Sequence, residues 1–228
     1  MPVEAGLNQL YWDLKGDPAP AFPGMILWGV RTLSASLPPG EYTVRLTADD
    51  VVETSTIAIE RNPWIEDVTD ADLVAQYEFA KEIQAKVAEA NSAVIAIRRA
   101  KVQMRERAMS SEDGPHEVIH PVMMKLNEVE ANIYQVRNRS GQDPLNFPIK
   151  VNNRLANLLS MVDRGDGAPN DGMREVFAIM VERLDGYTAT LRAIWENDLP
   201  AMNAALAERG LDAVDPWDET VVLVAPEG

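Results

Sequence analysis

The only two histidines of the chain lie four residues apart, in a segment that reads His-Glu-Val-Ile-His from His116 to His120. This is the His-Glu-x-x-His pattern. On a helix it places both imidazoles on one face to bind zinc, while the glutamate activates a water molecule. A zinc hydrolase that uses His116, Glu117 and His120 is therefore one function that these residue types allow.

Pro121 follows the second histidine directly and argues against such a site. Inside a helix its ring would clash with the carbonyl group of Glu117, whereas proline is favoured in the first helical turn. We therefore expect a helix to begin near Pro121, with the motif in the preceding loop. A third zinc ligand would have to be Glu128 or Glu130, two or more turns further along the same helix, which is a poor geometry. We prefer a surface helix start without a metal.

Other catalytic signatures are weak. The chain has no cysteine, which excludes disulfide bonds, thiolate nucleophiles and thiolate metal sites. No phosphate-binding glycine loop and no Gly-x-Ser-x-Gly segment occurs. Three acidic pairs resemble glycosidase carboxylates but lie in polar turns, where solvated charge explains them: Asp49-Asp50, Glu112-Asp113, and Asp166 near Asp171. We expect no catalytic residue, no cofactor and no metal.

The composition restricts the class of partner. The 228 residues carry a net charge of −15, and 46% of them are hydrophobic, a normal share for a folded core. Nucleic-acid binding needs a positive footprint, and so does adhesion to anionic lipid, so both are disfavoured. No apolar stretch is long enough to span a membrane, and the first residues lack the pattern of a signal peptide. Other protein subunits are the partners that remain.

The first 62 residues have the alternation of β-strands and contain six of the 15 prolines. Apolar and polar residues alternate in 41–47 and 51–59 around Asp49-Asp50, which predicts a β-hairpin. Residues 7–14 are a further strand candidate. The composition of residues 15–39 predicts an ordered loop or a short edge strand, because this segment is too apolar to remain in water. Together these elements indicate a small β-sandwich that is incomplete.

From residue 70 the spacing changes to that of helices. We expect a helix over about 70–108, with Thr69 and Asp72 as its capping signal. Further helices are expected over about 118–136, over 151–162 and over 173–195, with a short last helix near Pro200. The fold class is therefore α+β, a partial sandwich followed by an up-and-down helical bundle. The domains are 1–62 (sandwich), 63–212 (bundle) and 213–228, a tail with a candidate strand.

Candidate partner contacts come from the tail and from aromatic residues in irregular segments. Residues 219–225 include Thr-Val-Val-Leu-Val, a strand that could complete the sheet or pair with another chain. We therefore take Val222 and Leu223 as contacts, with Trp28 and Trp217 as aromatic anchors. Trp64 is expected to join the two halves of the chain.

Several long motifs carry a resemblance to a known family. They are Phe-Pro-Gly-Met-Ile-Leu-Trp at 22–28, Pro-Pro-Gly-Glu-Tyr-Thr-Val-Arg-Leu at 38–46, Asn-Ile-Tyr-Gln-Val-Arg at 132–137 and Asp-Pro-Leu-Asn-Phe-Pro at 143–148, with Gly-Leu-Asn at 6–8 leading into Trp-Asp-Leu at 12–14. Over roughly 6–212 the chain resembles the C-terminal region of bacterial exported proteins with Asp-box, sortilin-like β-propellers. Those proteins are often labelled glycosyl hydrolases or photosystem stability/assembly-factor-like proteins.

The resemblance implies an accessory module rather than a catalytic one. In such proteins the sugar or peptide chemistry belongs to the propeller, and the region resembled is an immunoglobulin-like sandwich followed by helices. That sandwich needs about seven strands, and this chain supplies four or five. The expectation is a non-enzymatic, extracytoplasmic (periplasmic) subunit that docks on a larger assembly, of which a photosynthetic membrane complex is one candidate. The alternatives are an accessory fragment of a propeller glycosidase and the zinc hydrolase.

Overall fold

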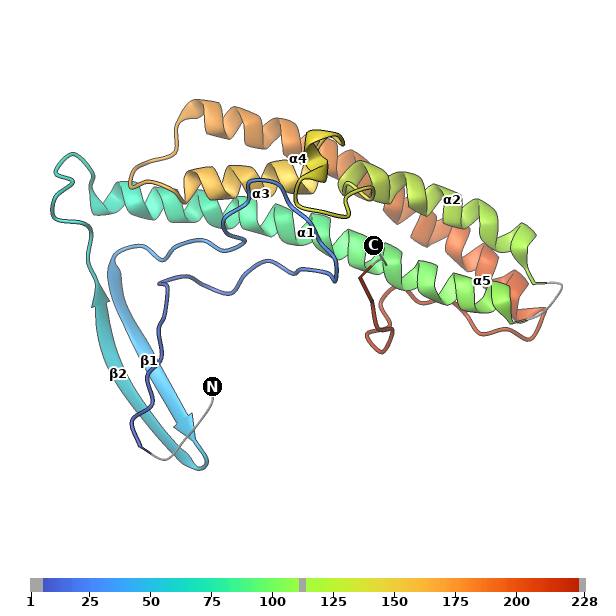
Figure 1. Cartoon of the computed structure of the whole chain (residues 1–228), viewed down its shortest axis with the longest axis horizontal. Coiled ribbons are helices and arrows are strands. Elements are labelled where there is room, and N and C mark those ends of the chain that lie inside the picture. The colour runs from blue at the N-terminus through green and yellow to red at the C-terminus, as the bar shows by residue number, and fades with distance from the viewer. Residues whose placement is uncertain (1–5, 111–113, 226–228) are drawn as a thin grey trace.

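The fold was examined in a computed structural model, which describes residues 6–110 and 114–225 (Figure 1). One two-stranded antiparallel hairpin is followed by helices, which confirms the α+β class. The described residues contain no β-sandwich, so the expected immunoglobulin-like sandwich is wrong. Within the same residues no helix combines the length and the apolar character needed to cross a membrane.

The hairpin consists of β1 (Gly40–Ala48) and β2 (Val51–Ile59), as the alternating residues predict. A two-residue turn joins the strands, and Asp49 in that turn has a φ of 51°. A positive φ at this position gives the turn the twist that suits a hairpin, although it is strained for a residue with a side chain. We call residues 40–59 the β arm.

The register of the β arm gives it two different faces. Tyr42 pairs with Ile57 and Thr43 with Thr56, so apolar side chains collect on one face and threonines on the other. The apolar face carries Tyr42, Val44, Leu46, Val51, Ile57 and Ile59, interrupted by Glu53 and Ser55.

The two other predicted strands do not form. Residues 7–14 are irregular, and a φ of 60° at Leu14 ends the extended backbone there. Residues 219–225 are also irregular, and Leu223 contributes to a groove on the helical side of the molecule instead. A strand needs a free edge beside it, and neither segment is aligned with an edge of the β arm.

The helical part is organised around α1 (Asp70–Met109). Thr69 and Asp72 form the predicted capping box, in which each side chain accepts a hydrogen bond from the other residue's backbone N–H group. The carboxylate of Asp72 has a lowered pKa because the Thr69 side chain and backbone donate to it. Two rows of residues seven positions apart lie in the core: α1 buries Ala80, Val87 and Val94 in one row and Ile83, Ala90, Ile97 and Met104 in the other.

The remaining helices form two further rods beside α1 (Figure 1). The first consists of α2 and α3 end to end, and α2 contacts one part of α1 while α3 contacts another. The second is unbroken, because a π-helical turn joins α4 directly to α5. The described part of the chain is thus a three-rod bundle in which two predicted helices lie in series. The elements are α2 (His116–Ile133), a 3-10 turn (Asp143–Leu145), α3 (Val151–Val162), α4 (Asp171–Ala193), the π turn (Ile194–Asp198) and α5 (Leu199–Ala207).

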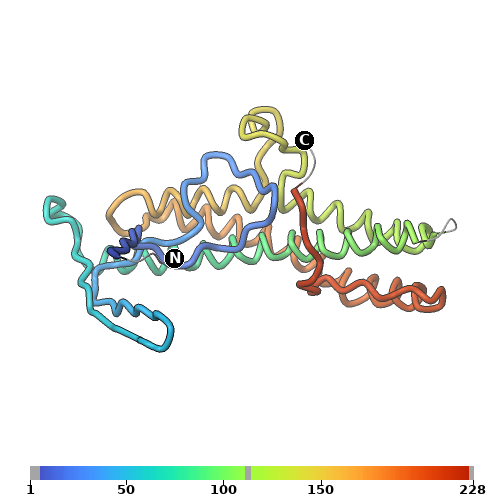
Figure 2. The backbone as a smooth tube through the Cα atoms, turned by 60° about the horizontal axis from the view of Figure 1, so that its bottom comes forward, coloured from blue at the N-terminus to red at the C-terminus, as the bar shows by residue number. Residues whose placement is uncertain are grey.

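Residues 15–37 form an ordered loop along the bundle (Figures 1 and 2). Buried Phe22 and Ala35 of this loop belong to the same core as α1 and α3. Side chains of the helices form hydrogen bonds with the backbone groups of this loop. From α1, Gln84 accepts from Ala35 N and donates to Asp17 O, and Asn91 donates to Pro20 O. From α3, Asn153 accepts from Trp28 N and donates to Trp28 O, and Ser160 accepts from Arg31 N. Buried backbone groups need partners, and here amide side chains replace a neighbouring strand.

Candidate functional site

The histidine motif lies at the start of α2. The helix begins at His116, and Pro121 lies inside it. The expectation that the helix begins near Pro121 is therefore wrong. Burial of Ile119 and Val122 against the core stabilises a first turn that local preferences disfavour.

The helix places His116 and His120 one turn apart, as the motif requires, but the described residues supply no third ligand. His116, Glu117 and His120 are all exposed, and Glu117 accepts a hydrogen bond from Arg209 of the segment after α5. No group of three or more His, Cys, Asp or Glu side chains in residues 6–110 and 114–225 is arranged to hold a metal ion. The carboxylate that would activate water is thus used in an ion pair.

The described members of the acidic pairs lie in turns or loops except Asp171, which is the first residue of α4. Asp49 and Asp50 form the tip of the β arm, and Asp166 and Asp171 are exposed near the loop between α3 and α4. The pair at 112–113 lies outside the described residues.

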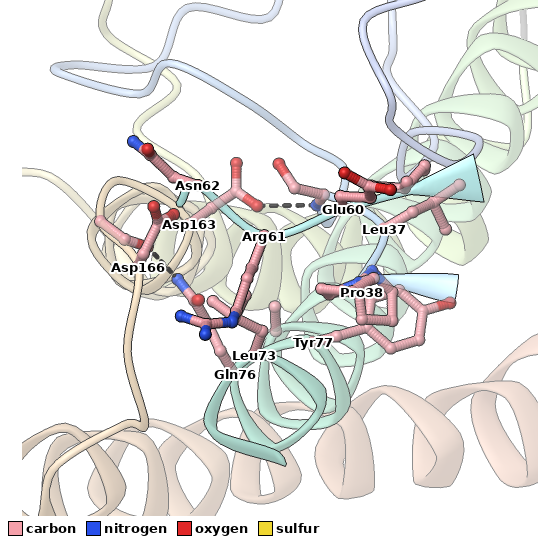
Figure 3. Close-up of a pocket in the computed structure, with 15 residues that line it drawn as sticks. Leu37, Pro38, Glu60, Arg61, Asn62, Leu73, Gln76, Tyr77, Asp163 and Asp166 are labelled. Carbon is pink, nitrogen blue, oxygen red and sulfur yellow. Dashed lines mark hydrogen bonds between the residues drawn. The ribbon is translucent and has the colours of Figure 1, made fainter. Parts of the chain in front are cut away.

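A pocket of about 250 Å³ lies where the base of the β arm meets the bundle (Figure 3). The labelled side chains of Arg61, Gln76 and Asp163 converge there from the segment after β2, from α1 and from the end of α3. Each of them is engaged in structural bonds. Arg61 donates to the carbonyl groups of Ile65 and Val68, Gln76 to those of Val162 and Gly165, and Asp163 accepts from Ser36 N and pairs with Lys15. We interpret this pocket as a structural junction.

The four expected partner contacts differ in what they can offer a partner. Trp28 is half-buried. Its backbone N–H group donates to Asn153 Oδ1 at 2.7 Å, and its backbone carbonyl group accepts from Asn153 Nδ2 at 2.9 Å, which fixes this residue against α3. Trp217 is 58% exposed and packs edge to face on Trp195 of the π turn, with ring centroids 5.6 Å apart. Val222 is exposed, whereas Leu223 is half-buried in a groove.

Trp64 does not join the two halves of the chain. Its side chain is 89% exposed, so that expectation is wrong. The junction is made instead by residues 15–37 and by polar contacts such as the bond from Ser36 N to Asp163 at 2.7 Å.

The β arm leaves strand edges and apolar side chains uncovered within the described chain. Neither strand packs against a helix, and the arm projects from the bundle (Figures 1 and 2). Its apolar face is open: Val44, Leu46 and Val51 are 42%, 53% and 59% exposed. Each strand also has one edge without a neighbouring strand in the described residues.

The base of the arm is better supported than its tip. Tyr42 donates from its hydroxyl group to Pro38 O at 2.7 Å, and Trp12 packs edge to face on its ring at 6.4 Å. Burial raises the pKa of Tyr42, and the charge of nearby Tyr77 adds to the effect. This end is therefore anchored, while the other end of the strands is free.

One basic groove was not predicted from the sequence. It lies between α1, α2, the loop after α2 and the tail, and its lining includes Arg98, Lys101, Arg105 and Arg139. The first three are spaced three and four residues apart, which is the spacing of one helix face and could have indicated the cluster. Arg139 could not be linked to them without the fold.

Comparisons with protein-family models, with curated proteins and with solved structures find no match to this chain. The fold and the candidate site therefore define the protein as a three-rod helical bundle that carries an uncovered β-hairpin.

Proposed function

We propose that the chain is a non-enzymatic interaction module, an extrinsic subunit that docks on a larger assembly. The free edge of β2 pairs with an extended, basic segment of another protein. The observation that supports this proposal is the β arm, whose outer edges have no neighbouring strand and whose apolar face is exposed at Val44, Leu46 and Val51 within the described residues.

An uncovered hairpin calls for a partner on energetic grounds. Two strands alone are at best marginally stable in water, and a third strand or a covering layer is needed for independent stability. Exposed edges also invite uncontrolled pairing, so proteins normally cover or shorten them. Here both strands are nine residues long, which is enough for an added strand to form a full ladder.

The turn determines which backbone groups face the partner. Because it has two residues, Ala48 and Val51 form a hydrogen-bonded pair, and this bonding alternates along the ladder. The amides of even-numbered β2 residues such as Thr54, and of odd-numbered β1 residues such as Thr43, are therefore directed at the free edges.

Charge selects the edge and the chemistry of the partner. The arm carries four acidic side chains and one basic side chain, Arg45 in β1, for a formal charge of −3. β2 has no basic residue and contains Glu53. A Lys- or Arg-bearing segment is therefore attracted along β2 and would meet Arg45 along β1.

The location of the assembly comes from the resemblance alone. The chain resembles modules of exported propeller proteins, so we propose that the docking partner lies outside the cytoplasm, and a photosynthetic membrane complex is one candidate for the assembly. The anchored base of the arm and the long rods would present β2 at a fixed position to such a partner.

The test is carbodiimide cross-linking of the protein during mild purification from its native source. This reagent joins carboxylates to amines in direct contact, and we expect Glu53 to be joined to lysines within one segment of another protein. Thr54→Pro removes an N–H group at the free edge of β2 and should abolish the cross-link. Thr43→Pro makes the same change on β1 and should leave it intact.

A second copy of the chain is the competing occupant. In an antiparallel pair of β1 strands centred on Thr43, Glu41 of each copy would face Arg45 of the other. Self-association that Thr43→Pro abolishes, or a Glu53 cross-link that survives in Thr54→Pro, would overturn the proposal. The absence of any Glu53 cross-link would do the same.

A further inference from the structure

The basic groove is an electrostatic exception in this acidic chain. It has a volume of about 670 Å³, within the usual range of small-molecule sites. Four of its lining side chains are basic and one, Glu130, is acidic, whereas the chain as a whole carries −15. Such a local excess of positive charge attracts anions that the rest of the surface repels.

Glu130 holds two of the cations in fixed positions. Its side chain is 3% exposed and accepts from Arg98 Nε at 2.8 Å and from Lys101 Nζ at 2.7 Å. The guanidinium group of Arg98 also lies over the ring of Phe22, at 4.5 Å from its centroid. One carboxylate cannot neutralise two cations, so this rigid cluster keeps a positive charge.

The other two cations have spare capacity. Arg105 is exposed and forms no ion pair within the described residues. Arg139 donates from Nη1 to the carbonyl groups of Val136 and Asn138 at 2.9 and 3.1 Å, which orients the guanidinium group. The nearby Asp143 carboxylate offsets part of its charge.

Apart from Asn127, the rest of the lining is apolar. Val102, Ala131 and Val136 lie on the helical side, and the tail contributes Leu223 and Val224. A small inorganic anion would leave this surface unused, and an uncharged lipid would leave the cations unused.

We propose that the basic groove binds an amphiphilic organic anion, in which a phosphate or carboxylate group is attached to an aliphatic body. The acidic group is bound by Lys101, Arg105 and Arg139, and the aliphatic body lies along Val102 and Leu223. Lys101 lies about three quarters of the way along α1 from Asp70, which is the end of the helix next to the β arm. The groove is therefore separate from the arm, and the proposal does not depend on the docking function.

Isothermal titration calorimetry of the full chain with octyl phosphate, below its micelle concentration, tests the proposal. We expect one site per chain and weaker binding as the salt concentration rises. Inorganic phosphate and uncharged octyl glucoside serve as probes of each half of the ligand, and each should bind at least tenfold more weakly. Octyl carboxylate in parallel shows which acidic group is preferred.

Matched variants locate the site. Arg105→Gln should weaken octyl phosphate binding by about tenfold or more, and Leu223→Ser by a similar factor. Arg154→Gln removes the same charge from an exposed position on α3 and should have no effect. Equal binding of octyl glucoside, equal binding of inorganic phosphate, or unchanged affinity in Arg105→Gln would each overturn the proposal.

Discussion

The loop 15–37 owes its order to side chains on α1 and α3, and Gln84 of α1 provides the sharpest test of this. Its Oε1 accepts from Ala35 N at 3.3 Å, and its Nε2 donates to Asp17 O at 2.7 Å. Gln84→Leu keeps most of the side-chain volume and removes both bonds. Ala35 is 1% exposed, so its N–H group would be left without water, whereas exposed Asp17 can be rehydrated.

The magnitude follows from these two environments. A buried N–H group without a partner costs about 1–3 kcal/mol, and a bond replaced by water costs about 0.5–1.5 kcal/mol. Burial of the added apolar surface of leucine offsets roughly 1 kcal/mol. We expect Gln84→Leu to lower the free energy of unfolding by about 2 kcal/mol, within a range of roughly 0.5–3.5 kcal/mol.

Urea unfolding followed by circular dichroism at 222 nm measures this change. Residues 15–37 share the core of the helices, so their loss should lower the midpoint of the helical transition. Gln142→Leu, at an exposed position, is the control and should change stability by less than about 0.5 kcal/mol. If Gln84→Leu were as mild as this control, side-chain amides would not be what holds the loop.

Two other predictions concern the turn of the β arm and the loop after α2. Asp49→Gly removes the strain of a φ of 51° and should slow amide hydrogen exchange in β1 and β2 by about fivefold or more, equivalent to roughly 1 kcal/mol. Asp50→Gly is the control. Equal effects of the two changes would contradict this explanation of the turn. The pKa of Asp143 is lowered because backbone N–H groups, first that of Arg139, donate to its carboxylate. Its stabilisation of the loop is therefore present above the unfolded pKa of about 3.9 and is lost as the pH falls through the lower folded pKa. The amide NMR shift of Arg139 should stay constant from pH 7 to about 4 and change only below it; a change near pH 6 would contradict this assignment.

The sequence was a good guide wherever local pattern and burial agree. The rows of apolar residues on α1 and the Thr69–Asp72 capping box were predictable, because both are set by spacing within one helix. The hairpin was predictable for the same reason, since its alternation and its turn are local.

Elements that depend on distant partners were mispredicted. The segment 219–225 has strand composition, but β-propensity mainly reflects fit to a neighbouring strand, and none lies beside it. At the start of α2, tertiary burial of Ile119 outweighs the penalty of Pro121. The basic groove combines α1, a loop and the tail, so only the fold brings Arg139 to Arg105.

The unbroken α1 gives the protein the properties of a molecular spacer. From Asp70, beside the β arm, to Lys101 in the basic groove, its axis extends about 46 Å at 1.5 Å per residue. The helix would therefore set the separation between a strand bound at the arm and a small ligand bound in the groove. A protein bound to the arm would hold the groove at a fixed distance from itself. If the same assembly carries an anionic ligand at that distance, binding at the arm raises the effective concentration of that ligand at the groove.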